Sequence, residues 1–379
     1  MSPASDVERR RLHDTFAALC RIVSPSGAER PCADAVAAQL AAIGVAVEED
    51  GAGPILGGDC GNLFARIPGT GEGSVLFCAH LDTVPVAAPI EPMLRDGVWE
   101  NANDAILGAD NKVAVATMLT LAERLARHPA EAAVELLFTV GEEVALAGAK
   151  EFETARLRSR VGFAFDNAMP VGGVVVSSPT YYRLTAELRG VAAHAGLRPE
   201  LGRSAVLAAA RAIARMPLGR IDAATTANIG VIEGGTAANV VPEHCRIVGE
   251  ARSFDAATAE RLASELAGCL ADAANDPECE CDLDVDLERQ FEGYRVRPSS
   301  PELALAFDAL RDCGFEPVAN ESGGGSDANA LRARGIAVLN LANGTERNHQ
   351  PDESVSATSL ERILDIAFAI VERAGRSGP

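Results

Sequence analysis

The chain contains an apolar, β-prone segment that ends in two residues with metal-ligand or acid–base chemistry. Residues 74–82 read SVLFCAHLD, so a predicted strand leads into His80 and Asp82 with one residue between them. Alternate side chains of an extended chain share a face, and the imidazole and the carboxylate therefore point the same way. An isolated pair of this kind is more often structural than functional. Its significance here comes from similar strand ends elsewhere in the chain.

Other predicted segments also end in acidic or imidazole side chains. They supply Glu142 and Glu143 after the strand 134–140, Asp166 at the end of 161–166, and His349 beyond 336–341. Asp110 begins a predicted helix over residues 113–127, where it also fits the role of an ordinary helix N-cap. Adjacent glutamates after an apolar strand repel each other unless a cation offsets their charge. The glutamate pair therefore favours a cation-binding site, with a solvated turn as the alternative.

These residues converge if the strands are parallel neighbours in an α/β sheet, because ligands bind at the carboxyl ends of such strands. The set contains two imidazoles and five carboxylates and no thiolate. Nitrogen and oxygen ligands of this kind suit zinc, cobalt or manganese. Five carboxylates at one rim would repel one another, and two metal ions relieve that repulsion. The residues alone thus predict a dinuclear metal site, with one carboxylate left to act as general base.

The composition limits the classes of binding partner and the cellular compartment that we expect for this protein. The 34 basic and 54 acidic residues give a formal charge of -20, so we expect neither nucleic acid nor a membrane surface as a partner. The nine cysteines include no C-x-x-C pair, which predicts reduced thiols in a cytoplasmic protein rather than a disulfide framework. The first helix-like segment mixes charges into its apolar positions, which is not typical of a signal peptide.

The order of predicted elements indicates two domains. Residues 1–178 and 297–379 alternate helices and strands, which predicts an α/β fold with a mixed, mostly parallel sheet flanked by helices. Residues 179–296 follow the β-α-β-β-α-β order of a ferredoxin-like α+β domain, inserted into the first one. The segment 83–107, rich in proline and glycine and poor in periodicity, is expected to be an irregular loop beside the site.

The motifs occur in an order that is similar to one known family. They are His80-Leu81-Asp82-Thr83-Val84-Pro85, Leu107-Gly108-Ala109-Asp110-Asn111-Lys112, Gly141-Glu142-Glu143, Asp166, Gly190-Val191-Ala192-Ala193-His194-Ala195-Gly196 and the loop with His349. This set resembles the dizinc exopeptidases and deacylases, which include peptidase T, carboxypeptidase G, acetylornithine deacetylase and succinyl-diaminopimelate desuccinylase. Residues 234–242 and 324–329 are most similar to the peptidase T branch. The resemblance implies a zinc-peptidase catalytic domain with an inserted lid and dimerisation domain.

The resemblance implies a role for each residue at the strand ends. Two zinc ions per subunit, with cobalt or manganese as alternatives, would occupy the site. The implied ligands are His80 and Asp166 for one ion, Glu143 and His349 for the other, and Asp110 as the bridge between them. Glu142 would be the general base that activates a water bridging the metals and returns its proton to the leaving amine. Asp82 would orient His80.

The inserted domain is also implied to contribute to the site. His194 would complete the site from the partner subunit of a homodimer and stabilise the oxyanion of the reaction. Asn239 and Arg252 would bind the carboxylate of the substrate, and the loop at Gly325 would line the pocket. A salt bridge on the domain surface is the alternative role for Arg252.

The combined hypothesis is a cytoplasmic, homodimeric metallopeptidase that hydrolyses amide bonds in small peptides. We expect an aminopeptidase that releases the N-terminal residue of tripeptides. A carboxypeptidase or an N-acyl amino acid deacylase on the same fold is the first alternative, and a non-catalytic peptide-binding protein is the remote one. Asn111 stands where many relatives carry a second aspartate after the bridging one, a departure that removes no expected metal ligand.

Overall fold

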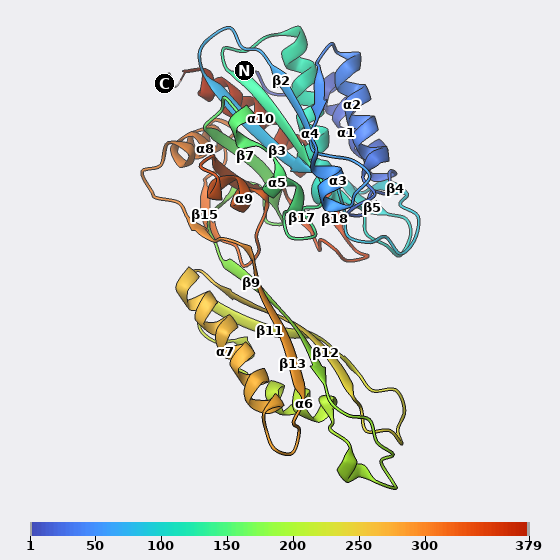
Figure 1. The fold of residues 1–379 in the computed structure, drawn as a ribbon. Helices are drawn as coiled ribbons and strands as arrows, with labels where there is room; N and C mark the ends of the chain where they lie inside the picture. The colour runs from blue at the N-terminus through green and yellow to red at the C-terminus, as the bar shows by residue number, and fades with distance from the viewer. Residues whose placement is uncertain (1, 377–379) are drawn as a thin grey trace. The chain divides into compact units, whose positions relative to one another are not determined.

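The computed structural model describes residues 2–376, which form two compact units. The first unit contains the chain up to Val176 and again from Arg295, and the second is the intervening segment Ser177–Tyr294. Figure 1 shows the ribbon with its elements labelled. Because the first unit contains the chain on both sides of this segment, the second unit is an insertion in it.

A nine-stranded sheet forms the centre of the first unit, and its four middle strands run parallel. Across the sheet, the middle strands are β6 (Ala133–Thr139), β3 (Ser74–His80), β7 (Val161–Asn167) and β16 (Ala337–Ala342). The other strands are β1 (Val47–Glu49), β2 (Leu63–Ile67), β8 (Gly173–Ser178), β14 (Tyr294–Arg295) and β15 (Val318–Glu321). The middle strands are apolar and largely buried, as parallel strands covered on both faces require.

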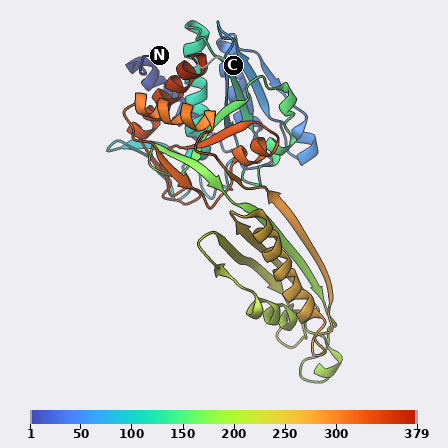
Figure 2. The same cartoon turned by 90° about the vertical axis from the view of Figure 1, so that its left-hand side faces the viewer.

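Helices cover both faces of this sheet, which Figure 2 shows nearly edge-on. One group of helices, each in contact with at least one other, is α1 (Asp6–Cys20), α2 (Arg30–Ala42), α4 (Ala109–Arg127), α8 (Pro301–Asp312) and α10 (Ala357–Arg376). A second group connected in the same way is α3 (Ala52–Leu56), α5 (Ala147–Glu151) and α9 (Asp327–Ala333). The predicted mixed α/β sheet flanked by helices is thus confirmed, with the parallel strands at its centre. Across residues 2–376, no helix is both long enough and apolar enough to cross a bilayer.

The inserted unit has an antiparallel sheet and two helices with a core of their own. The strands, in order across the sheet, are β10 (Gly219–Arg220), β11 (Thr225–Gly234), β12 (His244–Ser253), β9 (Thr180–Arg189) and β13 (Asp282–Phe291). Helices α6 (Ala205–Arg215) and α7 (Ala256–Ala274) contact each other and the sheet. The chain order β9-α6-β11-β12-α7-β13 is the predicted ferredoxin-like order, to which the short β10 is an addition.

The segment 83–107 is more regular than its composition indicated. Strands β4 (Pro92–Arg95) and β5 (Val98–Asn101) pair in an antiparallel hairpin and join β17 (Thr345–Glu346) and β18 (Ser354–Ser356) in a third sheet. Asp96 and Gly97 form the two-residue turn, with φ of 50° and 83°. Positive φ at both turn positions matches the twist of a hairpin, and Asp-Gly is a favoured sequence for it. The expectation of an irregular loop was therefore wrong for residues 92–101.

The core of the inserted unit gives a test of its packing. Leu266 on α7 is fully buried in that core, whereas Leu207 on α6 is 41% exposed. Replacing Leu266 by Ala should lower the free energy of unfolding by about 2–5 kcal/mol, because it leaves a cavity. The matched control Leu207→Ala should change it by no more than about 0.5 kcal/mol. Denaturant unfolding followed by circular dichroism measures both, and equal effects would contradict this description of the core.

Candidate metal centre

The middle strands of the first unit bring their polar ends to one edge of the sheet. His80 is the last residue of β3, and Asp166 lies next to the end of β7. Glu142 and Glu143 follow β6 after a short turn, and His349 lies in the loop between β17 and β18. Parallel neighbours end at the same edge, which is why residues far apart in the sequence meet here.

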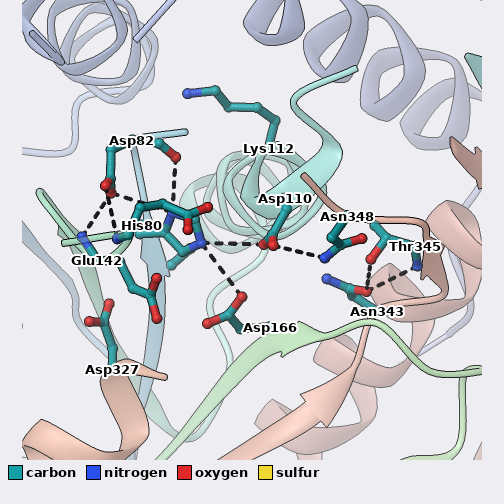
Figure 3. A network of polar contacts seen from close by, with 12 residues as sticks. His80, Asp82, Asp110, Lys112, Glu142, Asp166, Asp327, Asn343, Thr345 and Asn348 are labelled. Carbon is teal, nitrogen blue, oxygen red and sulfur yellow. Dashed lines mark hydrogen bonds and ion pairs between the residues drawn. The ribbon is translucent and has the colours of Figure 1, made fainter. Parts of the chain in front are cut away.

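His80 is at the centre of a first ligand cluster, drawn in Figure 3. Its Nε2 lies 3.3 Å from Asp110 Oδ1 and 3.5 Å from Asp166 Oδ1. Its Nδ1 lies 3.0 Å from the carbonyl oxygen of Asp82. A carbonyl only accepts, so Nδ1 carries the proton and Nε2 is the nitrogen that faces the carboxylates. That tautomer presents a lone pair where a metal ligand needs it.

His349 belongs to a second cluster with Glu143 and the same aspartate. Its Nε2 lies 2.9 Å from Glu143 Oε1 and 3.4 Å from Asp110 Oδ2. Both three-residue clusters have their ligand atoms close enough together to hold one cation each. Glu142 joins a further group with His80 and Glu143. The structure therefore brings all five predicted metal ligands and the predicted base to one place.

Asp110 connects the two clusters because its two oxygens face different imidazoles. It lies in the first turn of α4 with non-helical φ of -82° and ψ of 104°, after Gly108 in the left-handed region. Its side-chain oxygens face His80, His349 and Asn348, so an ordinary capping role does not describe Asp110. Asn348, which the sequence analysis did not select, donates its Nδ2 hydrogen to Asp110 Oδ2 at 2.7 Å.

The ionisation of the cluster indicates a shortage of positive charge. Burial raises the pKa of Asp166 to about 8, and the charge of nearby Asp110 adds to the effect. Burial also raises the pKa of Glu142 well above its usual value, with a further contribution from Asp166. Close approach of the Asp110 and Glu143 carboxylates raises the pKa of His349 to about 10. Buried acids that lie close together repel one another when no cation is present. Some carboxyl groups then keep their protons, and neighbouring imidazoles become protonated.

The donor set fits a pair of divalent cations. Glu143 Oε1 is buried and, among residues 2–376, has no hydrogen-bond partner of acceptable geometry, although His349 Nε2 is 2.9 Å away. The Glu143 oxygen and the His349 nitrogen therefore lie close together without a hydrogen bond between them. Two ligands of one metal ion have this arrangement. Imidazole nitrogens and carboxylate oxygens, without sulfur, suit zinc, cobalt or manganese.

Asp82 supports both strand ends of the site. Its Oδ1 accepts a hydrogen bond from Glu142 N at 3.0 Å, and its Oδ2 accepts from Glu143 N at 3.1 Å. Ser26 Oγ donates to Oδ2 at 2.7 Å. Asp82 therefore fixes the backbone of the glutamate pair as well as the ring of His80, which extends the role implied by the sequence.

A buried lysine anchors the peptide between the two residues of the first motif. Lys112 is fully buried on α4, and its Nζ donates to the carbonyl of Leu81 and, at 2.6 Å, to Ser24 Oγ. Its Nζ also lies 3.2 Å from Cys32 Sγ. The sequence analysis quoted Lys112 within a motif and gave it no role, because its partners are backbone and neutral groups that a ligand pattern does not reveal.

The glycine-rich loop before α9 also reaches this edge of the sheet. Gly325 lies two residues before Asp327, whose Oδ2 accepts from Thr139 Oγ1 at the end of β6 at 2.5 Å. Burial raises the pKa of Asp327 to about 6. Sequence reasoning selected Gly325 from this loop and missed Asp327, although an aspartate after a glycine-rich turn was a visible signal.

The remaining expected site residues belong to the inserted unit. His194 is exposed, and its neighbour Ala195 donates its backbone N–H to the carbonyl of Asn239 at 2.9 Å, so these two segments are adjacent. Arg252 lies near the far end of β12, stacked 4.3 Å from the Tyr181 ring and paired with Glu250 at 3.0 Å. Within one chain, Arg252 is thus separated from His194 and Asn239 along the sheet.

A further cluster of possible ligands differs from the two described above. Glu29, Asp59 and Cys60 have donor atoms close together. Burial raises the pKa of the Cys60 thiol to about 12, so it stays protonated. Glu29 Oε1 accepts from Gly141 N at 3.0 Å, next to the glutamate pair. We therefore interpret Glu29 as support for that turn and not as a ligand.

Known proteins resemble this chain along nearly its whole length. The model of Peptidase family M20/M25/M40 matches residues 76–373. Protein YqjE of Bacillus subtilis strain 168, described as uncharacterized, is 34% identical over 372 residues, which are 98% of this chain and 100% of that protein. The structure of aminopeptidase PepT from Bacillus cereus ATCC 10987 is 35% identical, covers 97% of this chain and 98% of its own, and has a TM-score of 0.85. A tripeptidase from Staphylococcus aureus Mu50 is 30% identical, with coverages of 97% and 99% and a TM-score of 0.91.

The matches extend across the segments that carry both ligand clusters, from His80 to His349. They agree with the fold and confirm the family resemblance that the motifs indicated. The sequence match, the parallel strand ends and the shared aspartate lead to the same assignment, and the chain belongs to peptidase family M20/M25/M40.

Proposed function

We propose that the chain is a metal-dependent aminopeptidase that removes the N-terminal residue of small peptides, tripeptides above all. The observation that carries this proposal is Asp110, whose two oxygens face two separate ligand clusters. A carboxylate shared by two cation sites is suited to two-metal hydrolysis. The likeness to an aminopeptidase PepT and to a tripeptidase supports peptides with a free N-terminus as the substrate class.

Two zinc ions per subunit, or cobalt or manganese in their place, would be held by residues of the first unit. The proposed ligands are His80 and Asp166 at one position, Glu143 and His349 at the other, and Asp110 at both. When bound, the metals supply Lewis acidity that polarises the scissile carbonyl and lowers the pKa of water.

Glu142 is the proposed general base. Four of the five carboxylates at the strand ends have another role: three are proposed ligands, and Asp82 accepts backbone hydrogen bonds. Glu142 is the fifth. Asp82 Oδ1 accepts a hydrogen bond from the backbone N–H of Glu142 at 3.0 Å, which fixes the position from which the Glu142 side chain extends. Glu142 takes a proton from the attacking water and gives it to the amine that leaves.

The inserted unit, proposed as residues 179–296 between catalytic segments 1–178 and 297–379, is assigned the roles of lid and dimer contact. We assign His194 to the oxyanion, from the partner subunit of a homodimer, and its exposure supports that role. Asn239 and Arg252 are assigned to the substrate carboxylate and Gly325 to the pocket wall. The separation of Arg252 from His194 within one chain is compatible with a site that two subunits share.

We place the enzyme in the cytoplasm. All nine cysteines are free thiols in the structure, and six of them are fully or nearly fully buried. Unpaired buried thiols suit a reducing compartment.

Replacing Glu142 by Ala should lower kcat by about 10²- to 10⁴-fold, because the step loses its proton acceptor. Metal content should remain that of the unmodified protein, because Glu142 is not a proposed ligand. Steady-state kinetics and elemental analysis measure the two quantities. Glu151→Ala, which changes an exposed glutamate on α5, is the matched control and should leave both unchanged. Near-normal turnover in Glu142→Ala would remove the assigned base.

Blocking the substrate amine separates the aminopeptidase from the deacylase and carboxypeptidase alternatives. A tripeptide with free termini should be hydrolysed, and its N-acetylated form should be rejected, because a site built for an ammonium group leaves polar groups unpaired when that charge is absent. Chromatography of the products should show release of the N-terminal residue first. Preferred cleavage of the acetylated peptide would favour the alternatives.

The metal-free protein should lose stability as pH rises from about pH 4 to about pH 10. The pKa of Asp166 is raised to about 8 and that of His349 to about 10, so the folded chain holds protons that the unfolded chain has released. Stability from such groups is greatest at low pH and is lost as pH rises through the folded-state values. Bound divalent ions supply the charge instead. Thermal unfolding of metal-free and metal-loaded protein should therefore diverge with pH, and parallel curves would contradict this account.

A further inference from the structure

Glu353 is a buried carboxylate that the metal site does not use directly. It is 1% exposed and lies four residues beyond His349, immediately before β18. Its Oε2 accepts from Gly108 N at 2.7 Å, and its Oε1 accepts from Asp110 N at 2.9 Å. The carboxylate is thus held by backbone N–H groups of the segment that carries the shared aspartate.

The environment of Asp110 explains why such an acceptor is needed. Its backbone dihedrals are not helical, so its N–H cannot belong to the regular ladder of α4. Gly108, two residues earlier, has a φ of 72° and turns the chain into that helix. A buried N–H without an acceptor costs free energy, and a carboxyl oxygen supplies that acceptor. Glu353 accepts both N–H groups of this turn.

The loop that carries His349 needs a similar constraint. Arg347 and His349 have φ of 59° and 66°, a left-handed conformation that is unfavourable for residues other than glycine. Glu353 N donates to the carbonyl of Gln350 at 3.0 Å, which closes a turn after His349. The following residue, Ser354, pairs with Glu100 of β5, so Glu353 stands between a strained loop and a sheet.

We infer that Glu353 is a positioning residue that holds the Asp110 turn and the His349 loop at a fixed separation, and so determines binding at the cation position of Glu143 and His349. This inference rests on the proposed dinuclear site. It concerns only how two loops are kept together, and gives Glu353 no contact with substrate or metal.

The effect is larger at one of the two positions, although Asp110 is a proposed ligand at both. His80 and Asp166 end strands β3 and β7, which pair directly with each other through Leu76, Phe77 and Cys78. Their separation is set by backbone hydrogen bonds of the sheet and does not depend on Glu353. His349 comes from a loop, and its distance from Asp110 depends on what joins that loop to the start of α4.

Two variants and a matched control test this inference in the full-length protein. Glu353→Gln keeps the shape of the side chain but presents an amide group to one of the two N–H donors. Glu353→Asp keeps the carboxyl group on a shorter side chain. Asp365→Asn is the control. Asp365 is also a buried carboxylate, 6% exposed, and it accepts a hydrogen bond from Ala4 N at 2.7 Å. Ala4 belongs to no loop that carries a proposed ligand.

Calorimetric titration of the metal-free proteins with cobalt(II) alone, together with the cobalt absorption spectrum, gives the affinity of each binding class. In Glu353→Gln one class should weaken by about 10- to 100-fold, which is typical for loss of a group that orients a ligand. It should be the class that His349→Ala removes and not the class that His80→Ala removes. Glu353→Asp should recover part of the loss, and Asp365→Asn should keep both classes.

Two results would overturn the inference. One is a Glu353→Gln protein that binds both classes with the affinity of the unmodified chain. The other is equal weakening of both classes, which would make Glu353 a general stabiliser. If Glu353→Gln does not fold, the titration of Glu353→Asp decides in the same way. Failure of the proposed dinuclear site would be distinguishable, because the unmodified chain would then bind fewer than two cobalt ions.

Discussion

The structure of the first unit depends on how buried negative charge is accommodated at the carboxyl ends of four parallel strands. Isolated carboxylates are costly to bury, and here they are matched with imidazoles, cation positions or backbone N–H groups. Asp82 accepts from the two glutamates that follow β6, and Glu353 accepts from the turn that begins α4. In both cases the acceptor is a side chain from one ligand segment and the donors belong to another. The same hydrogen bonds that satisfy the backbone thus fix the ligands relative to each other.

This arrangement assigns different tasks to strands and loops. Strands β3 and β7 place proposed ligands at positions determined by the sheet, while the loops around Asp110 and His349 place proposed ligands whose positions depend on a few side chains. Lys112 adds a third anchor by holding the carbonyl of Leu81 between the histidine and aspartate of the first motif. A site of this kind combines a rigid half with a half that individual substitutions can alter.

The sequence was sufficient to predict that acidic and imidazole groups after apolar strands meet at one edge, because parallel strands end together. His80, Glu143, Asp166 and His349 were accessible in this way, and Asp110 was accessible from the start of the following helix. The family resemblance implied which of them would bind metal. A group whose partners are backbone atoms was not accessible: Glu353 accepts from N–H groups of a segment that only the fold brings close. The hairpin at residues 92–101 was missed for a different reason, since its Asp-Gly turn was visible but was outweighed by proline and glycine content.

The position of β16 has a consequence for the order in which the molecule can be assembled. This strand lies between β7 and β8, but it follows the inserted unit in the chain, so the sheet lacks an inner member until more than a hundred later residues have emerged from the ribosome. Pairing of β9 with β13 brings the two ends of the insertion together, which shortens the effective loop and reduces the entropy lost when β16 docks. Early folding of the insertion therefore favours assembly of the sheet, because it brings together the two chain segments between which β16 must pair.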